Sequence, residues 1–400
     1  MAGFRIRIAL SFGLLPVVLI ALGVGATCAA DEIGVTPDSI LFGQVAALSG
    51  ASSALGQGMR QGIEAAFAEV NAAGGIHGRK LKLVSRDDGY DPDRSLVETR
   101  RLIEQDKVFA LIGAVGTPTT QLTAPLANEA HVPLIGPFTG ASFLRDPALS
   151  NVVNIRASYA AEAETWVKHL TEDLKLRKIA IFYQDDSFGR DGLAGVKKAL
   201  DKRRIDLLAE ATFERNTIAV RGALRTLKRA EPDAVVMVGS YRTCAEFIKL
   251  AHQSGFNPLF VNVSFVGANA LADELGPDGE GVIVSQVVPL PWDTSLPVVA
   301  DYLAAQRSLD QDLQPGFVSL EGYLAGRLTV EALARLGPDP TRADLLTMIH
   351  TGRFDLGGLV MDFRDDATDT APRVFLTVIQ PDGSFKAVDK LEPRQGQPKM

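Results

Sequence analysis

Hydroxyl residues stand at two successive points where an apolar strand of this chain is expected to end. The strand expected at residues 108–112 is followed by glycines and then by a helix that begins with Thr-Pro-Thr-Thr at 117–120. The next strand, at 132–135, is followed by Gly-Pro-Phe-Thr-Gly at 136–140. In an open parallel sheet, ligands bind beyond the carboxyl ends of the strands, where helix N-termini present free N–H groups. Threonine hydroxyls add donors there, so the pattern predicts a site for a carboxylate or another small anion, unless a threonine only caps its helix.

The other chemically capable residues do not form a catalytic set. The paired acids Asp87-Asp88 and Asp185-Asp186 follow expected strands and could perform acid–base chemistry, but helix capping or solvent exposure is favoured for them. The five histidines lack metal-site spacing, so no metal is expected. No Gly-x-Ser-x-Gly elbow and no P-loop occurs, and the glycines at 56, 58 and 62 are one residue too widely spaced for a dinucleotide fingerprint. The sequence therefore favours binding over turnover, without a cofactor.

The first thirty residues have the pattern of a targeting segment. Arg5 and Arg7 precede an apolar run at 8–24, and small residues follow up to Ala30. This pattern predicts a signal peptide at residues 1–30, cleaved after Ala30, and a soluble exported protein. An uncleaved anchor and lipid attachment at Cys28 are the alternatives.

The mature composition excludes several kinds of partner. Cleavage would remove two arginines from the 41 Lys and Arg and none of the 48 Asp and Glu, so the formal charge of −7 would become −9. An acidic balance argues against nucleic acid or anionic lipid as a partner. Cys244 would be the only cysteine left, so no disulfide within the mature chain is possible, and its place in an apolar helical stripe indicates a buried thiol.

The expected elements alternate between strand and helix. Apolar strands are expected at 40–48, 81–84, 108–112, 132–135, 151–156, 179–183, 207–213, 234–238, 259–263 and 281–288. Such uniformly apolar strands are buried on both faces, as in parallel sheets covered by helices. The strands form two series that meet near 154–157 and 288–291, and 370 mature residues exceed the usual size of a single core. The predicted fold class is α/β, with two doubly wound parallel-sheet lobes, further helices at 297–307, 319–336 and 341–350, and a final β portion at 358–388.

Dispersed motifs in nearly the whole mature chain add a resemblance to a known family. They are Val-Ala-Ala-Leu-Ser-Gly at 45–50, Asn-Ala-Ala-Gly-Gly-Ile-His-Gly at 71–78, Asp-Asp-Gly-Tyr-Asp-Pro at 87–92, Leu-Ile-Gly at 111–113, Val-Pro-Leu-Ile at 132–135, residues 185–189 and Ser-Leu-Glu-Gly-Tyr at 319–323. In combination they resemble the type I periplasmic solute-binding proteins of ABC importers, in the leucine/isoleucine/valine-binding branch.

The resemblance implies two lobes joined by a three-crossover hinge that closes on a small-molecule solute. Lobe 1 would be about residues 31–155 plus 290–368, and lobe 2 about 156–289 plus 369–400. The implied function is capture of a small carboxylate, such as a branched-chain or other hydrophobic amino acid or a keto or organic acid, by a monomer that delivers it to an ABC transporter membrane permease. The alternative is a sensor protein that reports the solute to a signalling receptor. An enzyme is not expected.

The resemblance also implies the ligand-binding residues. The hydroxyl that meets the ligand carboxylate falls on Thr117, and its partners fall on Phe138, Thr139 and Gly140. Aromatic contacts from the opposite lobe fall on Phe188 and Tyr241.

Three of the implied positions depart from the family pattern. Leu55 replaces an aromatic residue, Gly140 a ligand-binding threonine, and Ser264 the acid that pairs with the ligand ammonium. A buried ammonium without a carboxylate partner is costly, so either Asp186 substitutes or the solute carries no amine. The family's early disulfide is also absent, with Tyr90 and Gly116 at its cysteine positions.

Overall fold

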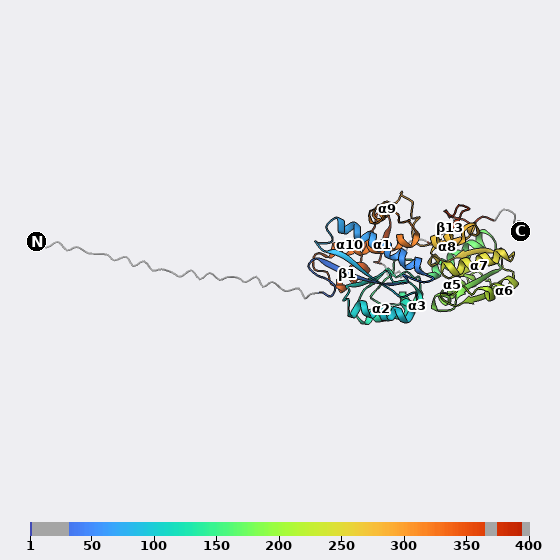
Figure 1. Cartoon of the computed structure of the whole chain (residues 1–400), viewed down its shortest axis with the longest axis horizontal. Coiled ribbons are helices and arrows are strands. Elements are labelled where there is room, and N and C mark those ends of the chain that lie inside the picture. Colours follow the sequence, from blue (N-terminus) through green and yellow to red (C-terminus); the bar gives the residue numbers. More distant parts are fainter. Residues whose placement is uncertain (2–31, 365–373, 394–400) are drawn as a thin grey trace. The chain divides into compact units, whose positions relative to one another are not determined.

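The computed structural model describes Met1 and residues 32–364 and 374–393. The expected signal peptide, the proposed lobe boundary at 368/369 and the end of the chain after residue 393 lie outside the described residues. Chain contacts separate Met1–Asp31 from one compact unit, Glu32–Met400, which holds the described helices and strands (Figure 1).

The first sheet has five parallel strands in the order β2-β1-β3-β4-β5. The strands are β1 (Ser39–Ala46), β2 (Lys80–Asp87), β3 (Ala110–Ile112), β4 (Leu134–Ile135) and β5 (Val152–Val153). The intervening helices are α1 (Ser53–Ala72), α2 (Pro92–Glu104), α3 (Thr117–Glu129) and the short η1 (Ser142–Arg145). Strands β3, β4 and β5 are buried throughout, as expected for parallel strands covered by helices.

The second sheet repeats this winding and then adds two antiparallel strands. Its strand order is β14-β13-β10-β9-β8-β6-β7. From β10 to β7 each strand is parallel to the next one in this order. Strand β13 is antiparallel to β10, and β14 to β13. The strands are β6 (Ile179–Gln184), β7 (Ala209–Phe213), β8 (Ala234–Val238), β9 (Leu259–Asn262), β10 (Ile283–Gln286), β13 (Phe375–Ile379) and β14 (Phe385–Val388). Its helical segments are α4 (Tyr159–Lys168), η2 (His169–Asp173), α5 (Ser187–Asp201), α6 (Arg221–Ala230), α7 (Tyr241–Gln253), η3 (Ser264–Val266), α8 (Ala268–Leu275) and η4 (Gly276–Gly279).

Three later helices follow the second series, and one of them packs closely on α1. They are α9 (Pro297–Leu309), α10 (Phe317–Leu336) and α11 (Arg342–His350), followed by the hairpin β11 (Arg353–Asp355) and β12 (Val360–Asp362). A Cβ on Gly62 would lie 1.9 Å from the Ser319 carbonyl oxygen, and one on Gly322 would lie 2.3 Å from that of Met59. These glycines let α1 and α10 approach each other, which Figure 1 also shows. Gly62, which was compared with the last glycine of a dinucleotide fingerprint, therefore serves helix packing.

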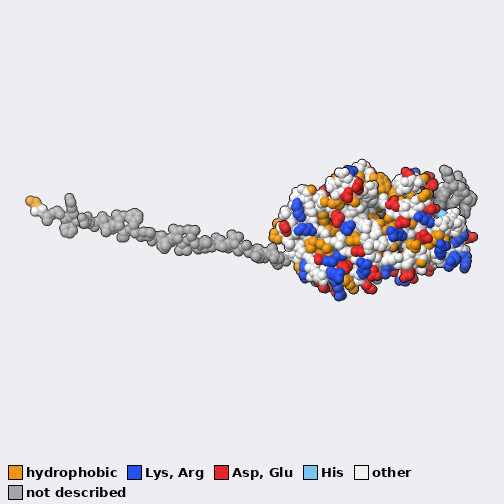
Figure 2. Space-filling view, in the orientation of Figure 1, with side chains coloured by type: hydrophobic (Ala, Val, Ile, Leu, Met, Phe, Trp, Pro, Cys, Tyr) orange, Lys and Arg blue, Asp and Glu red, His pale blue; other side chains and the backbone are white. Residues whose placement is uncertain are grey.

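Both sheets carry the 2-1-3-4-5 order of a doubly wound fold, so the predicted fold class is confirmed. Cys244 is fully buried on α7, and burial raises the pKa of its thiol. Among the described residues, no helix is long and apolar enough to cross a membrane, and no group of three or more His, Cys, Asp or Glu side chains could hold a metal ion. Acidic and basic side chains are interspersed over the face shown in Figure 2.

Candidate ligand-binding site

Three buried hydroxyls meet at the ends of the strands singled out from the sequence. Thr117 begins α3, Thr139 follows β4, and Tyr159 begins α4. The Thr117 Oγ1 lies 2.7 Å from the Thr139 Oγ1 and 3.4 Å from the Tyr159 Oη, and the Thr139 Oγ1 lies 3.2 Å from the Tyr159 Oη. We call these three residues the hydroxyl cluster. Burial raises the pKa of Tyr159 to about 12, so its phenol stays a proton donor at neutral pH.

The neighbouring threonines of α3 behave differently from Thr117. The Thr119 hydroxyl donates to the Val115 carbonyl at 2.6 Å, and the Thr120 hydroxyl donates to the Gly116 carbonyl. The cap position of α3 is Gly116, without a side-chain cap. Thr117 therefore does not cap its helix, and its hydroxyl is free to exchange its cluster contacts for a ligand.

Gly140 makes room for the third hydroxyl. A Cβ on Gly140 would lie 2.8 Å from the Tyr159 ring and 2.9 Å from the Ala157 carbonyl oxygen. The Gly140 carbonyl accepts a hydrogen bond of 2.9 Å from the Tyr159 N–H. Where the family places a ligand-binding threonine, this chain thus packs Tyr159, which brings a hydroxyl of its own.

Aromatic rings from both sheets gather next to the hydroxyl cluster. Phe188, at the start of α5, lies 5.3 Å from the Tyr159 ring, measured between centroids. Phe265, in η3, lies 4.6 Å from Phe188, 5.2 Å from Phe138 and 6.1 Å from Tyr90. We call these five residues the aromatic cluster. Phe138 and Tyr90 follow strands of the first sheet, so the cluster joins side chains of the two sheets.

A buried arginine lies beside the aromatic cluster, and its charge acts on the Tyr159 hydroxyl. Arg156 is 1% exposed, and its guanidinium lies 4.5 Å from the Phe138 ring centroid. Its Nη2 donates to the Ser264 Oγ, and its Nε lies 3.5 Å from the Glu321 Oε1. Within the described part of the chain, the Arg156 Nε and Nη1 have no hydrogen-bond partner. A buried guanidinium with unused donors is costly unless an anion satisfies them.

Two buried glutamates accompany Arg156. Glu162 accepts hydrogen bonds from the Ser264 N–H and hydroxyl, both at 2.9 Å, and from the Ser285 hydroxyl. A carboxylate on α4 thus contacts position 264, where the resemblance implies an acid, but its oxygens already accept these hydrogen bonds. Glu321 is 2% exposed, and burial raises its pKa to about 7.

Asp186 lies close to the site but is compensated by other groups. Its carboxylate caps α5 by accepting from the Phe188 N–H at 3.0 Å, and it also accepts from the Gln184 side-chain amide at 2.6 Å. Arg215 forms an ion pair with it at 3.1 Å. The negative charge of Asp186 is thus compensated within the chain.

Leu55 and Tyr241 both lie next to Gly267. The Tyr241 hydroxyl accepts a hydrogen bond of 3.4 Å from the Ala54 N–H. Leu55 is buried against the backbone of Gly267, where an added Cβ would lie 2.5 Å from the Leu55 Cδ2. These contacts join α1 to the segments around η3 and α7.

Two grooves open beside these contacts. One, of about 710 Å³, is lined by residues of α3 and α5, among them Thr117, Asp186 and Arg190. The other, of about 410 Å³, is lined by Tyr241 together with Ala54 and Gln57 of α1. Thr117 is thus the member of the hydroxyl cluster that lines the first groove.

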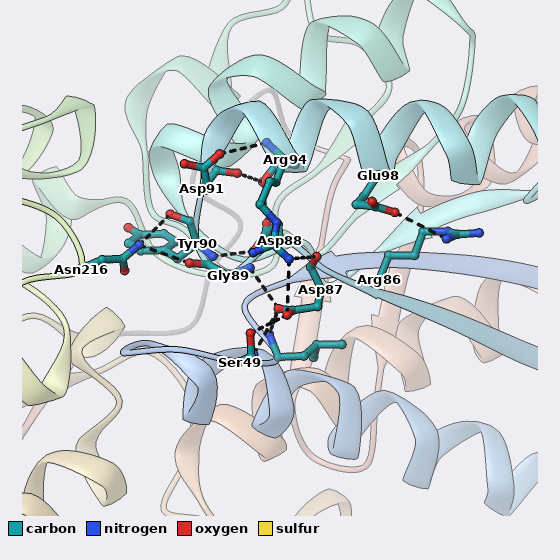
Figure 3. Close-up of polar contacts among 12 residues, drawn as sticks. Ser49, Arg86, Asp87, Asp88, Gly89, Tyr90, Asp91, Arg94, Glu98 and Asn216 are labelled. Atoms are coloured by element: carbon teal, nitrogen blue, oxygen red, sulfur yellow. Dashed lines mark hydrogen bonds and ion pairs between the residues drawn. The ribbon is translucent and has the colours of Figure 1, made fainter.

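The acids Asp87 and Asp88 organise a turn (Figure 3). Asp87 accepts from the Leu48 and Ser49 N–H groups at 2.8 and 3.1 Å. Asp88 accepts from the Tyr90 N–H at 2.8 Å and from a serine hydroxyl, and burial raises its pKa to about 6. The turn gives Tyr90 a φ of +61°. These carboxylates therefore stabilise the loop that carries Tyr90 into the aromatic cluster. The expected helix capping or solvent exposure is wrong for them, because Asp91 caps α2 and Asp88 is fully buried.

The same loop is tied to the second sheet. The Asn216 side-chain amide donates to the Gly89 carbonyl at 3.2 Å, as Figure 3 shows. The Tyr90 hydroxyl accepts a hydrogen bond of 3.4 Å from the Gln184 side chain. Segments of both sheets thus enclose the aromatic cluster.

Of the residues expected at the site, the structure brings Thr117, Phe138, Thr139, Gly140, Phe188 and Ser264 together around Arg156 and Tyr159. Sequence reasoning missed Tyr90 as a site residue, together with Arg156, Tyr159, Glu162, Phe265 and Glu321. One signal was present: Glu162 and Tyr159 extend the apolar stripe of α4 that contains Trp166, so both had to face inward.

Two doubly wound sheets with a polar and aromatic site at their strand ends fit the class of solute-binding proteins. Residues 39–384 match the model of the periplasmic binding protein family. A relative from Brucella abortus (strain 2308), the Leu/Ile/Val-binding protein homolog 7, is 26% identical over 333 residues, which cover 80% of this chain and 82% of the relative.

Solved structures agree with the family match. A possible leucine/isoleucine/valine-binding protein from Rhodopirellula baltica SH 1 is 36% identical, with a TM-score of 0.84, and the match covers 90% of this chain and 98% of that one. A solute-binding protein of an ABC transporter from R. palustris, solved with benzoate, shares the fold at 19% identity and a TM-score of 0.75, over 88% of this chain and 95% of that one.

The chain belongs to the periplasmic binding protein family, in its Leu/Ile/Val-binding type, as the sequence predicted. Members of this family are periplasmic, bind solutes for ABC transport and are not enzymes.

Proposed function

We propose that this chain captures a small organic carboxylate and delivers it to the membrane permease of an ABC importer. Two lobes built on the two sheets, with boundaries near residues 155/156, 289/290 and 368/369, would close on the solute by hinge motion. A cleaved signal peptide at residues 1–30 would bring the mature monomer to the periplasm.

The observation that carries this proposal is the hydroxyl cluster beside Arg156. Thr117, Thr139 and Tyr159 supply three hydroxyls within 3.4 Å of one another. Arg156 adds a buried cation with unused Nε and Nη1 donors in the described structure. Charge-assisted hydrogen bonds to a carboxylate are among the strongest available in a buried site.

The carboxylates around the site favour a solute without an amine. Asp186 is paired with Arg215, the Glu162 oxygens accept three hydrogen bonds, and Glu321 faces Arg156. A ligand ammonium would have to displace a partner of Asp186 or Glu162, or meet Glu321, whose pKa burial raises to about 7, and an uncompensated buried charge is costly. One relative is named for leucine, isoleucine and valine, whereas a neighbour of the same fold was solved with benzoate, an acid without an amine, which supports the second kind of solute. We therefore propose a keto, aliphatic or other organic acid for this chain.

Replacing Thr117 by valine tests the proposal with little change in shape. Isothermal titration calorimetry of the wild type with a panel of keto, aliphatic and aromatic acids first identifies a bound acid. Thr117→Val should then weaken its binding by about 1 to 3 kcal/mol, because a hydrogen bond to a charged group is lost.

Thr120→Val is the matched control. Thr120 is equally buried in α3, but its hydroxyl donates to the Gly116 carbonyl and lies outside the cluster. The control should retain affinity for the acid. Equal affinity of Thr117→Val and wild type would refute the role of the Thr117 hydroxyl.

A further inference from the structure

Phe265 occupies the centre of the aromatic cluster. Its ring is fully buried and lies 4.6 Å from Phe188 in the second sheet's half of the chain. It also lies 5.2 Å from Phe138 and 6.1 Å from Tyr90, which follow strands of the first sheet. A single side chain therefore fills the space among rings carried by both sheets.

The backbone around Phe265 is held on both sides. Ser264 is anchored through its N–H and hydroxyl to the Glu162 carboxylate. Gly267 has a φ of +80° and approaches Leu55 so closely that an added Cβ would lie 2.5 Å from the Leu55 Cδ2. Because both ends of this short turn are fixed, the position of the ring follows from the backbone.

Two of the rings that contact Phe265 also contact polar groups of the proposed site. Phe138, on one side of Phe265, has the Arg156 guanidinium 4.5 Å from its centroid. Phe188, on another side, contacts Tyr159 of the hydroxyl cluster at 5.3 Å. A carboxylate held by Arg156 and the hydroxyls would direct its apolar part toward the volume that the Phe265 ring fills.

We propose that Phe265 sets the size of the solute by occupying the position of its apolar part. This inference rests on the proposed capture of a carboxylate at the hydroxyl cluster. A short aliphatic acid fits beside the ring, whereas an acid that carries a phenyl group competes with the ring for the same volume. Replacing Phe265 by a smaller residue leaves this volume open to the apolar part of the solute.

The test compares Phe265→Ala and Phe265→Leu with the wild type. Isothermal titration calorimetry measures acetate, isovalerate and phenylacetate binding to each protein, and circular dichroism and thermal melts show that each is folded. Phe265→Ala should raise the affinity for phenylacetate relative to isovalerate by about tenfold or more, since a mismatch of even one methylene in an apolar pocket changes affinity by about 10 to 200-fold. Phe265→Leu should show a smaller change in the same direction.

Phe247→Leu controls for loss of a buried ring elsewhere. Phe247 is also fully buried, but it lies on α7 and stacks on Phe182 at 4.3 Å, within the core of the second sheet. Its substitution should leave the ratio of phenylacetate to isovalerate affinity unchanged.

Two outcomes would overturn the inference alone. Wild type and folded Phe265→Ala could bind the acids with the same affinity ratio, which would show that the ring does not limit size. Phe265→Ala could instead weaken all three acids equally, which would make the ring a wall that contacts the solute. If neither the wild type nor any variant binds any of the acids, the proposed capture of a carboxylate fails, and this inference with it.

Discussion

Glu321 is expected to make the stability of this protein depend on pH in an unusual direction. Its carboxyl lies on α10, 2% exposed, with Arg156 and Glu162 as the charged groups that face it. Burial raises its pKa from an ordinary value of 4.5 to about 7. Between pH 4.5 and about pH 7, the Glu321 carboxyl is protonated in the folded protein but has lost its proton in the unfolded chain. The free energy of unfolding contributed by this group therefore falls as the pH rises through that interval.

The magnitude follows from the difference between the two pKa values. At about 1.4 kcal/mol for each pH unit, the wild type should lose about 2 to 3 kcal/mol through this group between pH 5 and pH 8. Glu321→Gln cannot titrate, so its stability relative to the wild type should improve by that amount over the same interval. Any constant cost of the substitution, such as the loss of the contact with Arg156, cancels in this comparison.

Urea unfolding at pH 5, 6, 7 and 8 provides the measurement. Glu331→Gln is the matched control for the loss of a carboxyl from the same helix, because the Glu331 side chain is 35% exposed. If the stabilities of Glu321→Gln and wild type run parallel from pH 5 to pH 8, the assignment of a buried, protonated Glu321 is wrong.

Two further predictions concern the solute. Arg156→Met should weaken binding of the identified acid by about tenfold or more in calorimetry, because a charged donor is removed. The control is Arg203→Met, which removes a partly buried arginine that is paired with Glu164 and Glu172, and it should retain affinity for the acid. Equal affinities of both variants would show that Arg156 does not bind the acid. For a matched pair of solutes, 4-methyl-2-oxopentanoate should bind at least as tightly as leucine, and Asp186→Asn should affect both alike, since Asp186 is paired with Arg215. Tighter leucine binding that Asp186→Asn selectively abolishes would show instead that Asp186 holds an ammonium.

The sequence predicted those parts of the molecule that depend on local pattern. The apolar strands and their glycine-rich ends placed Thr117 and Thr139 at neighbouring strand ends, and the structure brings their hydroxyls to 2.7 Å. The alternating elements predicted two doubly wound sheets. Strand β13 joins β10 in the antiparallel sense, a reversal that no local pattern of apolar residues encodes.

The missed site residues depend on contacts between distant segments. Arg156 contacts Glu321, 165 positions later in the numbering, and Phe265 meets Tyr90 from the other sheet. Phe265 follows β9 and could have packed in the core of the second sheet, but it contacts rings from both sheets. Which of the two occurs depends on how the sheets pack together, and the spacing of residues in the sequence does not determine that packing. The sequence left open whether Asp186 pairs with a ligand ammonium or whether the solute carries no amine. The ion pair of Asp186 with Arg215, which the sequence did not reveal, favours the second alternative.

A crystal structure of the wild type with the acid identified by calorimetry tests the central claim most directly. The account predicts that the solute carboxylate lies within hydrogen-bond distance of the Thr117 hydroxyl and the Arg156 guanidinium, with residues of both sheets around it. A carboxylate bound elsewhere, or a solute that contacts only one of the two sheets, would contradict it.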